Sequence, residues 1–126
     1  MAITNTGAIL AAQCLMNDSA TFLSSSNAHL GVGDSNTAFA AAQTDLQAAS
    51  NKLRKAMESG YPTRSSGALT FRSLYGTSEA NFAWAEWGVF NASSSGTMFS
   101  RKVESLGTKT NTQSWQLTAT VTVAAA

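Results

Sequence analysis

The sequence predicts an α+β fold, in which a helical N-terminal half packs on an antiparallel β-meander or sandwich-like sheet. Two observations predict it. Apolar residues recur at helical spacing over about 44–59, and after Pro62 large apolar residues alternate with polar ones over about 68–123. With 126 residues the chain is long enough for one core, so we expect a single domain over 1–126.

The first elements are short and separated by polar links. Residues 6–16 are apolar and compatible with a helix, and 24–27 form a polar link. The apolar run 28–34 predicts a strand that enters a Gly/Asp turn. Segment 3–16 has little in its sequence that requires it to pack on its own domain, so 1–27 is a candidate N-terminal arm or docking segment.

The one clear helix is predicted over about 44–59. Thr44 and Gln47 have the spacing of a capping box, in which each side chain satisfies a free amide of the first turn. Gly60 and Pro62 then end the helix. The predicted apolar face consists of Leu46, Ala49, Leu53, Ala56 and Met57.

Four strands are predicted after Pro62. Residues 69–75 and 115–123 alternate between apolar and polar side chains, which is typical of strands with one buried face. Residues 82–90 carry large apolar groups on both faces and are expected to lie at the centre of a sheet, covered on both sides. A Ser/Gly turn at 91–96 leads into the strand 97–103.

Composition narrows the classes of function. Charged residues are only 12% of the chain and the net charge is +1, so a nucleic-acid partner is not expected. A surface with few charges is easily desolvated, which suits a subunit of a larger assembly. Apolar windows are too short for a membrane span, and no Lys or Arg precedes the apolar N-terminal stretch as in a signal peptide. We expect a protein made in the cytoplasm, with no membrane partner.

Groups suited to catalysis or metal binding are scarce. His29 is the only histidine and Cys14 the only cysteine. A lone histidine without an orienting partner is better explained as structural, and a cysteine among apolar residues as a small core residue. We therefore expect no enzyme activity, no catalytic residues, no metal site and no cofactor.

Glu86 is an unusual residue within the most apolar strand. A carboxylate there needs a partner or a subunit boundary, and Arg72 and Arg101 on the flanking strands are the candidates; the alternative is that Glu86 faces water. The candidates for structural or interface roles are Trp84, Glu86, Trp87, Phe90, Arg72, Arg101 and Phe99. We expect another chain to cover some of the aromatic side chains Phe82, Trp84, Trp87, Phe90 and Phe99.

Several short motifs follow one another in a characteristic order. They are LGVGD at 30–34, QTDL at 43–46, NFAWAEWGVFN at 81–91 and GTMFSR at 96–101, and between the second and third come the basic end of the predicted helix at Arg54 and then Phe71. Over about 28–123 the chain resembles the N-terminal attachment domain of phage tail-collar fibre proteins. Those domains carry a VGDG turn, a QT-x-L helix start, a strand ending in E-x-G-L-[FY], and a GTL or GTM strand with a basic residue.

The resemblance implies a virion structural protein that docks on other virion proteins and assembles symmetrically, with a trimer favoured. Fibres of that family continue into a shaft and a receptor-binding tip, whereas this sequence ends in an Ala-rich tail. The expectation is therefore an accessory subunit of the tail, collar or baseplate. The alternatives are a capsid decoration protein and, in another class, a small carbohydrate-binding module with an exposed Trp.

Overall fold

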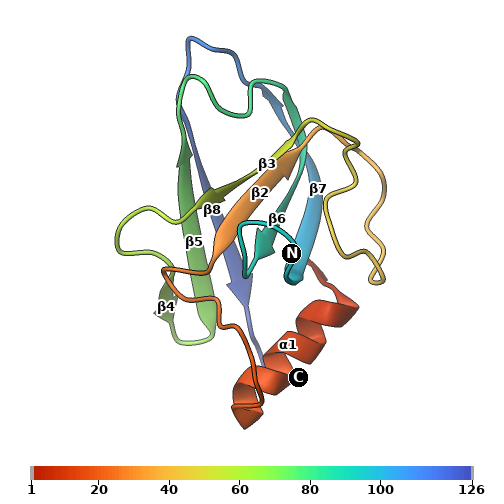
Figure 1. Ribbon diagram of the computed structural model, residues 1–126, viewed down its shortest axis with the longest axis vertical. Coiled ribbons are helices and arrows are strands. Elements are labelled where there is room, and N and C mark those ends of the chain that lie inside the picture. The colour runs from red at the N-terminus through yellow and green to blue at the C-terminus, as the bar shows by residue number, and fades with distance from the viewer. Residues whose placement is uncertain (1, 126) are drawn as a thin grey trace.

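Two antiparallel β-sheets face each other across the core, and one helix covers part of an open end (Figure 1). The computed structural model describes residues 2–125. The larger sheet has the strand order β1-β7-β6-β2-β3, and the smaller one has the order β4-β5-β8. In chain order the elements are β1 (Ala2–Ile3), α1 (Asn5–Met16), β2 (His29–Gly33), β3 (Lys52–Ala56), β4 (Thr63–Ser65), β5 (Ala68–Tyr75), β6 (Ala83–Phe90), β7 (Met98–Thr108) and β8 (Trp115–Thr122).

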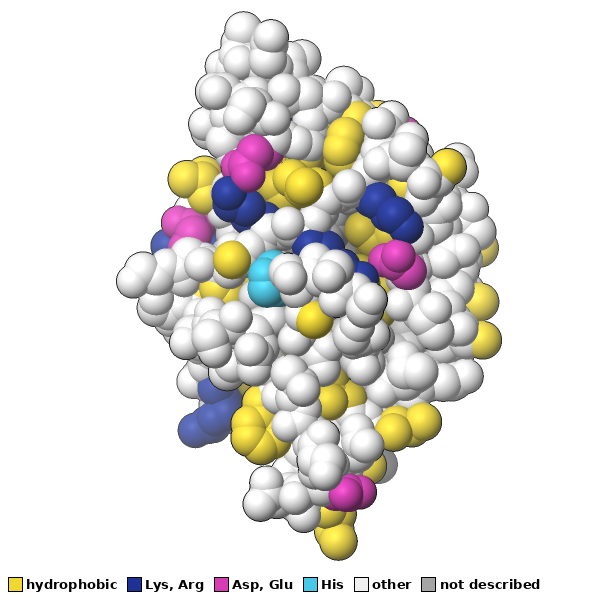
Figure 2. All heavy atoms as spheres, viewed as in Figure 1, with side chains coloured by type: hydrophobic (Ala, Val, Ile, Leu, Met, Phe, Trp, Pro, Cys, Tyr) yellow, Lys and Arg dark blue, Asp and Glu magenta, His cyan; other side chains and the backbone are white. Residues whose placement is uncertain are grey.

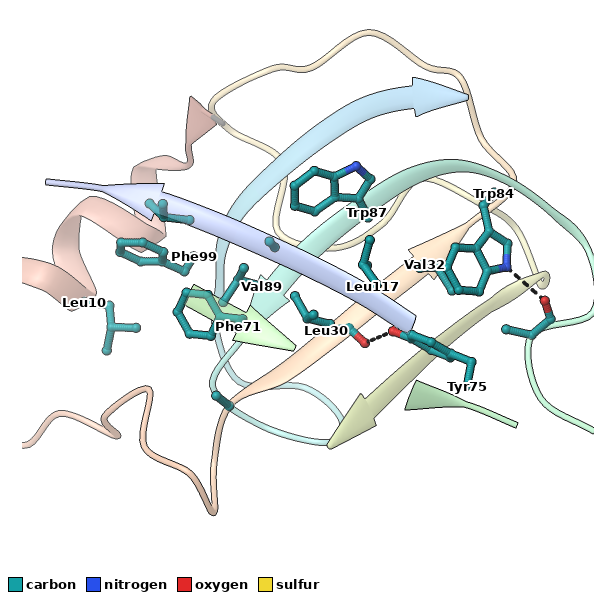
Figure 3. Packing of buried hydrophobic residues seen from close by; sticks show 14 residues of the cluster. Leu10, Leu30, Val32, Phe71, Tyr75, Trp84, Trp87, Val89, Phe99 and Leu117 are labelled. Carbon is teal, nitrogen blue, oxygen red and sulfur yellow. Dashed lines mark hydrogen bonds between the residues drawn. The ribbon is translucent and has the colours of Figure 1, made fainter. Parts of the chain in front are cut away.

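The core lies between the two sheets (Figure 3). Two polar atoms of large aromatic side chains are satisfied inside it. The Tyr75 hydroxyl donates to the Leu30 carbonyl at 2.5 Å, and the Trp84 indole donates to the Ala80 carbonyl at 3.0 Å. Burial of each large apolar side chain contributes about 1.5–3 kcal/mol. The larger members are Leu10, Leu30, Val32, Phe71, Tyr75, Trp84, Trp87, Val89, Phe99, Leu117 and Val121.

The predicted α+β class is confirmed, with one N-terminal helix and antiparallel sheets. The helix predicted at 6–16 is α1, and the strand predicted at 28–34 contains β2. In β8 every second side chain is buried, namely Leu117, Ala119 and Val121, as the alternation indicated. The C-terminal half therefore forms β-strands as predicted, although these strands pair in a different order from the predicted meander.

The helix predicted over about 44–59 is wrong. Residues 34–51 contain no helix or strand, and β3 follows at Lys52–Ala56. The capping box does not form, because the Gln47 side chain donates to the Asp45 carbonyl and the Leu46 amide donates to the Asp45 carboxylate. Residues 52–56 instead complete an unbroken five-residue ladder with β2. Tertiary pairing has here outweighed local helix propensity.

The β-meander is also wrong in detail. β5 does not pair with β6, its successor in the chain; its partner is β8, in register from Ala68↔Thr122 to Tyr75↔Trp115. β6 pairs with β7 and β2 in the other sheet. The sandwich-like alternative describes the molecule, because the chain crosses between sheets after β5 and again before β8.

The ladder between β6 and β7 is irregular beside the core tryptophans. Trp84 faces Gly107 and Glu86 faces Val103, so β7 carries two extra residues between these pairs. Trp84 and Trp87, although three residues apart, both belong to the main core. Phe90 instead belongs to a second cluster with Leu46 and Met98, beneath the 34–51 loop. Both faces of β6 are thus covered, as its composition predicted.

Candidate functional site

The predicted aromatic candidates lie inside their own chain. Trp84, Trp87, Phe90 and Phe99 are all buried there. The prediction that another chain covers some of them is wrong for these four, because the two sheets, α1 and the 34–51 loop already cover them. Phe82 is half-buried. Their role is structural, which was the alternative left open by the sequence.

Glu86 and Arg101 form an ion pair that is completely inaccessible to solvent. Arg101 Nε donates to Glu86 Oε1 at 2.8 Å, and both side chains have 0% exposure. The predicted pairing of Glu86 is confirmed with Arg101. Arg72 instead pairs with Glu58 at 3.0 Å, on the half-exposed side of the smaller sheet.

The pair holds the irregular 34–51 loop against β6 and β7. The Glu86 carboxylate accepts from the Gln47 and Ala48 amides, each at 2.8 Å. The Arg101 guanidinium donates to Gln43 Oε1 at 3.0 Å and to the Thr37 carbonyl at 2.9 Å. Backbone groups that would otherwise be buried without partners are satisfied in this way. The loop therefore owes its shape to two side chains of the sheet beneath it.

All four motifs behind the family resemblance meet at this pair. Gln43 comes from the second motif, Glu86 from the third and Arg101 from the fourth. Gly33, from the first, lies opposite Glu86 in the ladder, and a Cβ there would stand 2.4 Å from Glu86 Oε2. We call these four residues and their contacts the motif network. A glycine is required at position 33 because the carboxylate occupies the space that a side chain would need.

A second group of charges lies beside the motif network. The Arg54 guanidinium stacks 3.7 Å from the centre of the Phe90 ring and donates to the carbonyls of Ala92 and Ser95. Asp45 pairs with Lys52 at 3.0 Å and with Arg54 at 3.5 Å. Burial raises the pKa of the Asp45 carboxyl, but hydrogen bonds from Lys52 and Leu46 and the two cations together hold it below its ordinary value.

Lys109 is a buried cation that sequence analysis missed. Its side chain lies between the β5–β6 connection and the end of β7, and Nζ donates to the Gly76 carbonyl at 2.6 Å and to Asn81 Oδ1 at 2.8 Å. The position is polar in sequence and carries no periodic signal. Its role is to close that end of the sandwich.

The opposite end of the sandwich is apolar and open. A groove of about 330 Å³ runs between α1 and the edges of both sheets, lined by Leu10, Ala11, Cys14, Leu15, Leu23, Leu69, Phe99 and Val123. Large apolar side chains project into solvent around it. The most exposed are Leu15 (88%), Met16 (79%) and Val123 (62%), with Ile9 and Phe22 about half exposed.

We call the groove and these projecting side chains the apolar end face. In Figure 2, hydrophobic side chains lie over the lower end, where Figure 1 places α1, while most visible charges lie at mid-height. α1 itself contains no charged residue. A helix that is apolar on nearly every side is normally covered on every side.

The N-terminal segment nevertheless packs firmly on its own domain. Thr4 caps α1 by accepting from the Gly7 amide at 2.9 Å, and its hydroxyl donates to the Met98 carbonyl at 2.6 Å. β1 pairs with β7, and a Cβ on Gly7 would stand 2.1 Å from the Phe99 carbonyl oxygen. The surface that this segment offers to another protein is therefore the outer side of α1, packed in place on its own domain.

The remaining chemistry-bearing side chains have ordinary surroundings. His29 Nδ1 lies 2.8 Å from the Asn27 carbonyl, at the start of β2. Within residues 2–125 no three side chains of the metal-ligating types gather into a cluster. In the same part of the chain, α1 is too short to count as a candidate membrane span.

Comparisons with known proteins identify no relative. No protein-family model matches the chain, and neither a curated protein nor a solved structure matches it significantly.

Proposed function

We propose that this chain is a non-enzymatic virion structural protein of a tailed phage. Its place would be as an accessory subunit of the tail, collar or baseplate, acting through protein–protein assembly. The observation that carries the proposal is the motif network. Four short motifs, spread from residue 30 to residue 101, each supply one residue to a single buried contact. Residues joined in one such contact have a physical reason to occur together, which supports the family resemblance.

The apolar end face supports assembly as the mode of action. Exposed large apolar groups gathered on one end, such as Leu15 and Met16, mark contacts with other proteins rather than with small polar ligands. The partners would be other virion proteins and further copies of the chain, with a trimer favoured by the resemblance. The protein would reside in the virion after synthesis in the host cytoplasm.

The rigid outer surface of the larger sheet also suits docking. The 34–51 loop is fixed by the buried charge pair and by Leu46 against Phe90 and Met98. A loop that is ordered before binding loses less conformational entropy when a partner covers it. A partner that binds there would meet a preformed surface.

The test uses phage particles made with the gene for this chain disrupted. Purified protein is added to those particles, heads and tails are separated, and the bound chain is quantified by mass spectrometry. Binding to tails at a fixed copy number is the expected result. Binding to heads would favour the capsid decoration alternative, and binding to neither would refute the proposal.

The carbohydrate-binding alternative now rests on Trp115 alone. Trp84 and Trp87 are buried, whereas Trp115 is half-buried, packs edge-on against Trp84, and borders a shallow hollow with Leu106 and Gln116. A glycan array compares the native chain with Trp115→Ala. Binding that disappears in the variant would support this alternative, and no binding by the native chain would exclude sugars on the array.

A further inference from the structure

We propose that the apolar end face is a contact between two copies of this chain, in which Leu15 of each copy enters the groove of the other. The inference rests on the proposed role in assembly, and it names a two-fold contact that joins copies in pairs, which is a different contact from that of the trimer favoured by the resemblance. The groove and the projecting side chain lie on the same end of one molecule, and Leu15 is itself part of the groove wall. A surface with both a projection and a recess can complement itself about a two-fold axis.

The charges around this surface favour a second copy over a different partner. Asp18 follows the end of α1, and Arg64 borders a smaller depression that shares Leu23 and Leu69 with the groove. Among the described residues, neither Asp18 nor Arg64 has an ion-pair partner in its own chain. One negative group thus follows α1 and one positive group borders the groove's neighbour, and two copies can pair such opposite charges with each other.

The lack of charged residues in the groove and on α1 also favours a second copy of the chain as the partner. Every residue of the groove is apolar or cysteine, and α1 carries no charged side chain that would repel its symmetry mate. A strongly charged partner would meet no side chain of opposite charge in the groove. Like surfaces can approach one another because neither must bury an unpaired charge.

The exposed apolar area is large enough for a weak, specific contact. Five large apolar side chains on α1 or near the groove are exposed, three of them by more than 60%, and two of the five, Leu15 and Val123, line the groove itself. Together they form a patch on the order of several hundred Å², which is the size at which patches on monomers become interaction sites. A standard interface buries about 800 Å² on each partner. The remaining area would come from the polar rim, and association in the micromolar range is expected.

The first experiment measures self-association of the purified chain by sedimentation equilibrium from about 1 to 200 μM. Leu15→Asp should raise the dissociation constant by at least about tenfold, because it would bury an unpaired charge in the groove of the other copy. The matched control is Leu74→Asp, an exposed leucine on β5 that does not line the groove. Both side chains are substantially exposed, so both variants should fold, as circular dichroism would verify.

A charge exchange tests the orientation of the contact. Asp18→Arg and Arg64→Asp should each weaken association, because each places like charges opposite one another. The double variant Asp18→Arg/Arg64→Asp should restore it to within about threefold of the native value. Restoration requires that the two positions face each other across the contact, which a merely structural role of either residue does not predict.

Cys14 supplies an independent readout in the native protein. It is the only cysteine and lines the groove. Its reaction with a thiol reagent should slow as the protein concentration rises through the dissociation constant. In Leu15→Asp the rate should no longer depend on protein concentration.

The outcomes separate this inference from the proposed function. A native chain that is monomeric at 200 μM, or that associates equally well as Leu15→Asp, overturns the inference. If such a protein still binds phage tails, the proposed function stands and a different virion protein covers the end face. Association through Leu15 without binding to any particle would support the inference and refute the function.

Discussion

The buried ion pair gives the sharpest prediction about stability. Glu86→Gln removes a carboxylate that accepts three hydrogen bonds, from Arg101 Nε and from the Gln47 and Ala48 amides, each at 2.8 Å. The glutamine amide can supply only one oxygen, so its NH₂ group must face a donor. Arg101 would keep its charge at 0% exposure with neutral acceptors only, among them Gln43 Oε1 and the Thr37 carbonyl.

The expected loss is about 3–5 kcal/mol in the free energy of unfolding, because a buried charge is left without its partner. A typical domain of this size has about 5–15 kcal/mol in total. The control is Glu58→Gln, which removes the half-exposed partner of Arg72 and should cost about 0–1 kcal/mol. Urea unfolding monitored by tryptophan fluorescence measures both variants.

Hydrogen exchange locates the effect. In Glu86→Gln the amides of Gln47 and Ala48 should lose protection before the core strands do, since their acceptor is the substituted group. A loss below about 1 kcal/mol, or one equal to that of Glu58→Gln, would refute the reasoning. Unchanged protection of the two loop amides would equally show that the carboxylate does not hold the loop.

Two further predictions concern other parts of the molecule. Gly7→Ala should destabilise the protein, because the new Cβ would stand 2.1 Å from the Phe99 carbonyl oxygen. In an ordinary helix the same change stabilises by about 0.5–1 kcal/mol. A rise in the thermal midpoint of the variant would contradict the close packing of α1 on β7. Hydrogen bonds from Lys55 and from the Gly76 amide, helped by nearby cations, lower the pKa of the Glu79 carboxyl below its ordinary value of 4.5. The stabilisation by Glu79 should therefore be full above about pH 4.5 and disappear as the pH falls through the lower folded pKa. Unfolding of native and Glu79→Gln protein from pH 7 to pH 3 should converge towards the acid end, and a difference that grows there would have the wrong sign.

The structure of segment 44–59 could not be predicted from its own sequence pattern. Its apolar residues do have helical spacing, but Leu46 packs on Phe90 and Met98 while Leu53 lies in β3 opposite Val32. Those partners come from strands up to about fifty residues away in sequence. Periodicity within the segment could not reveal that the edge of β2 would pair with the backbone of 52–56, or that the Glu86 carboxylate would bind the amides of Gln47 and Ala48.

The site was predicted only in part. The conflict between a carboxylate and an apolar strand was visible in the sequence, so the need of Glu86 for a cationic partner could be inferred, and Arg101 was one of two candidates. The irregular pairing of β6 with β7 between Trp84 and Glu86 could not be inferred, nor could the burial of both Trp84 and Trp87 in one core. The apolar end face was foreseen only as a segment without strong reasons to pack.

The sequence by itself determined the α+β class, the position of α1, and the strands whose side chains alternate, such as β8. These features depend on local periodicity, which each segment carries within itself. Tertiary structure alone decided the division into two sheets, the pairing of β5 with β8, and the conversion of 52–56 into a strand. Those choices depend on which distant segment offers the better hydrogen-bond partners and burial, and no local pattern contains that comparison.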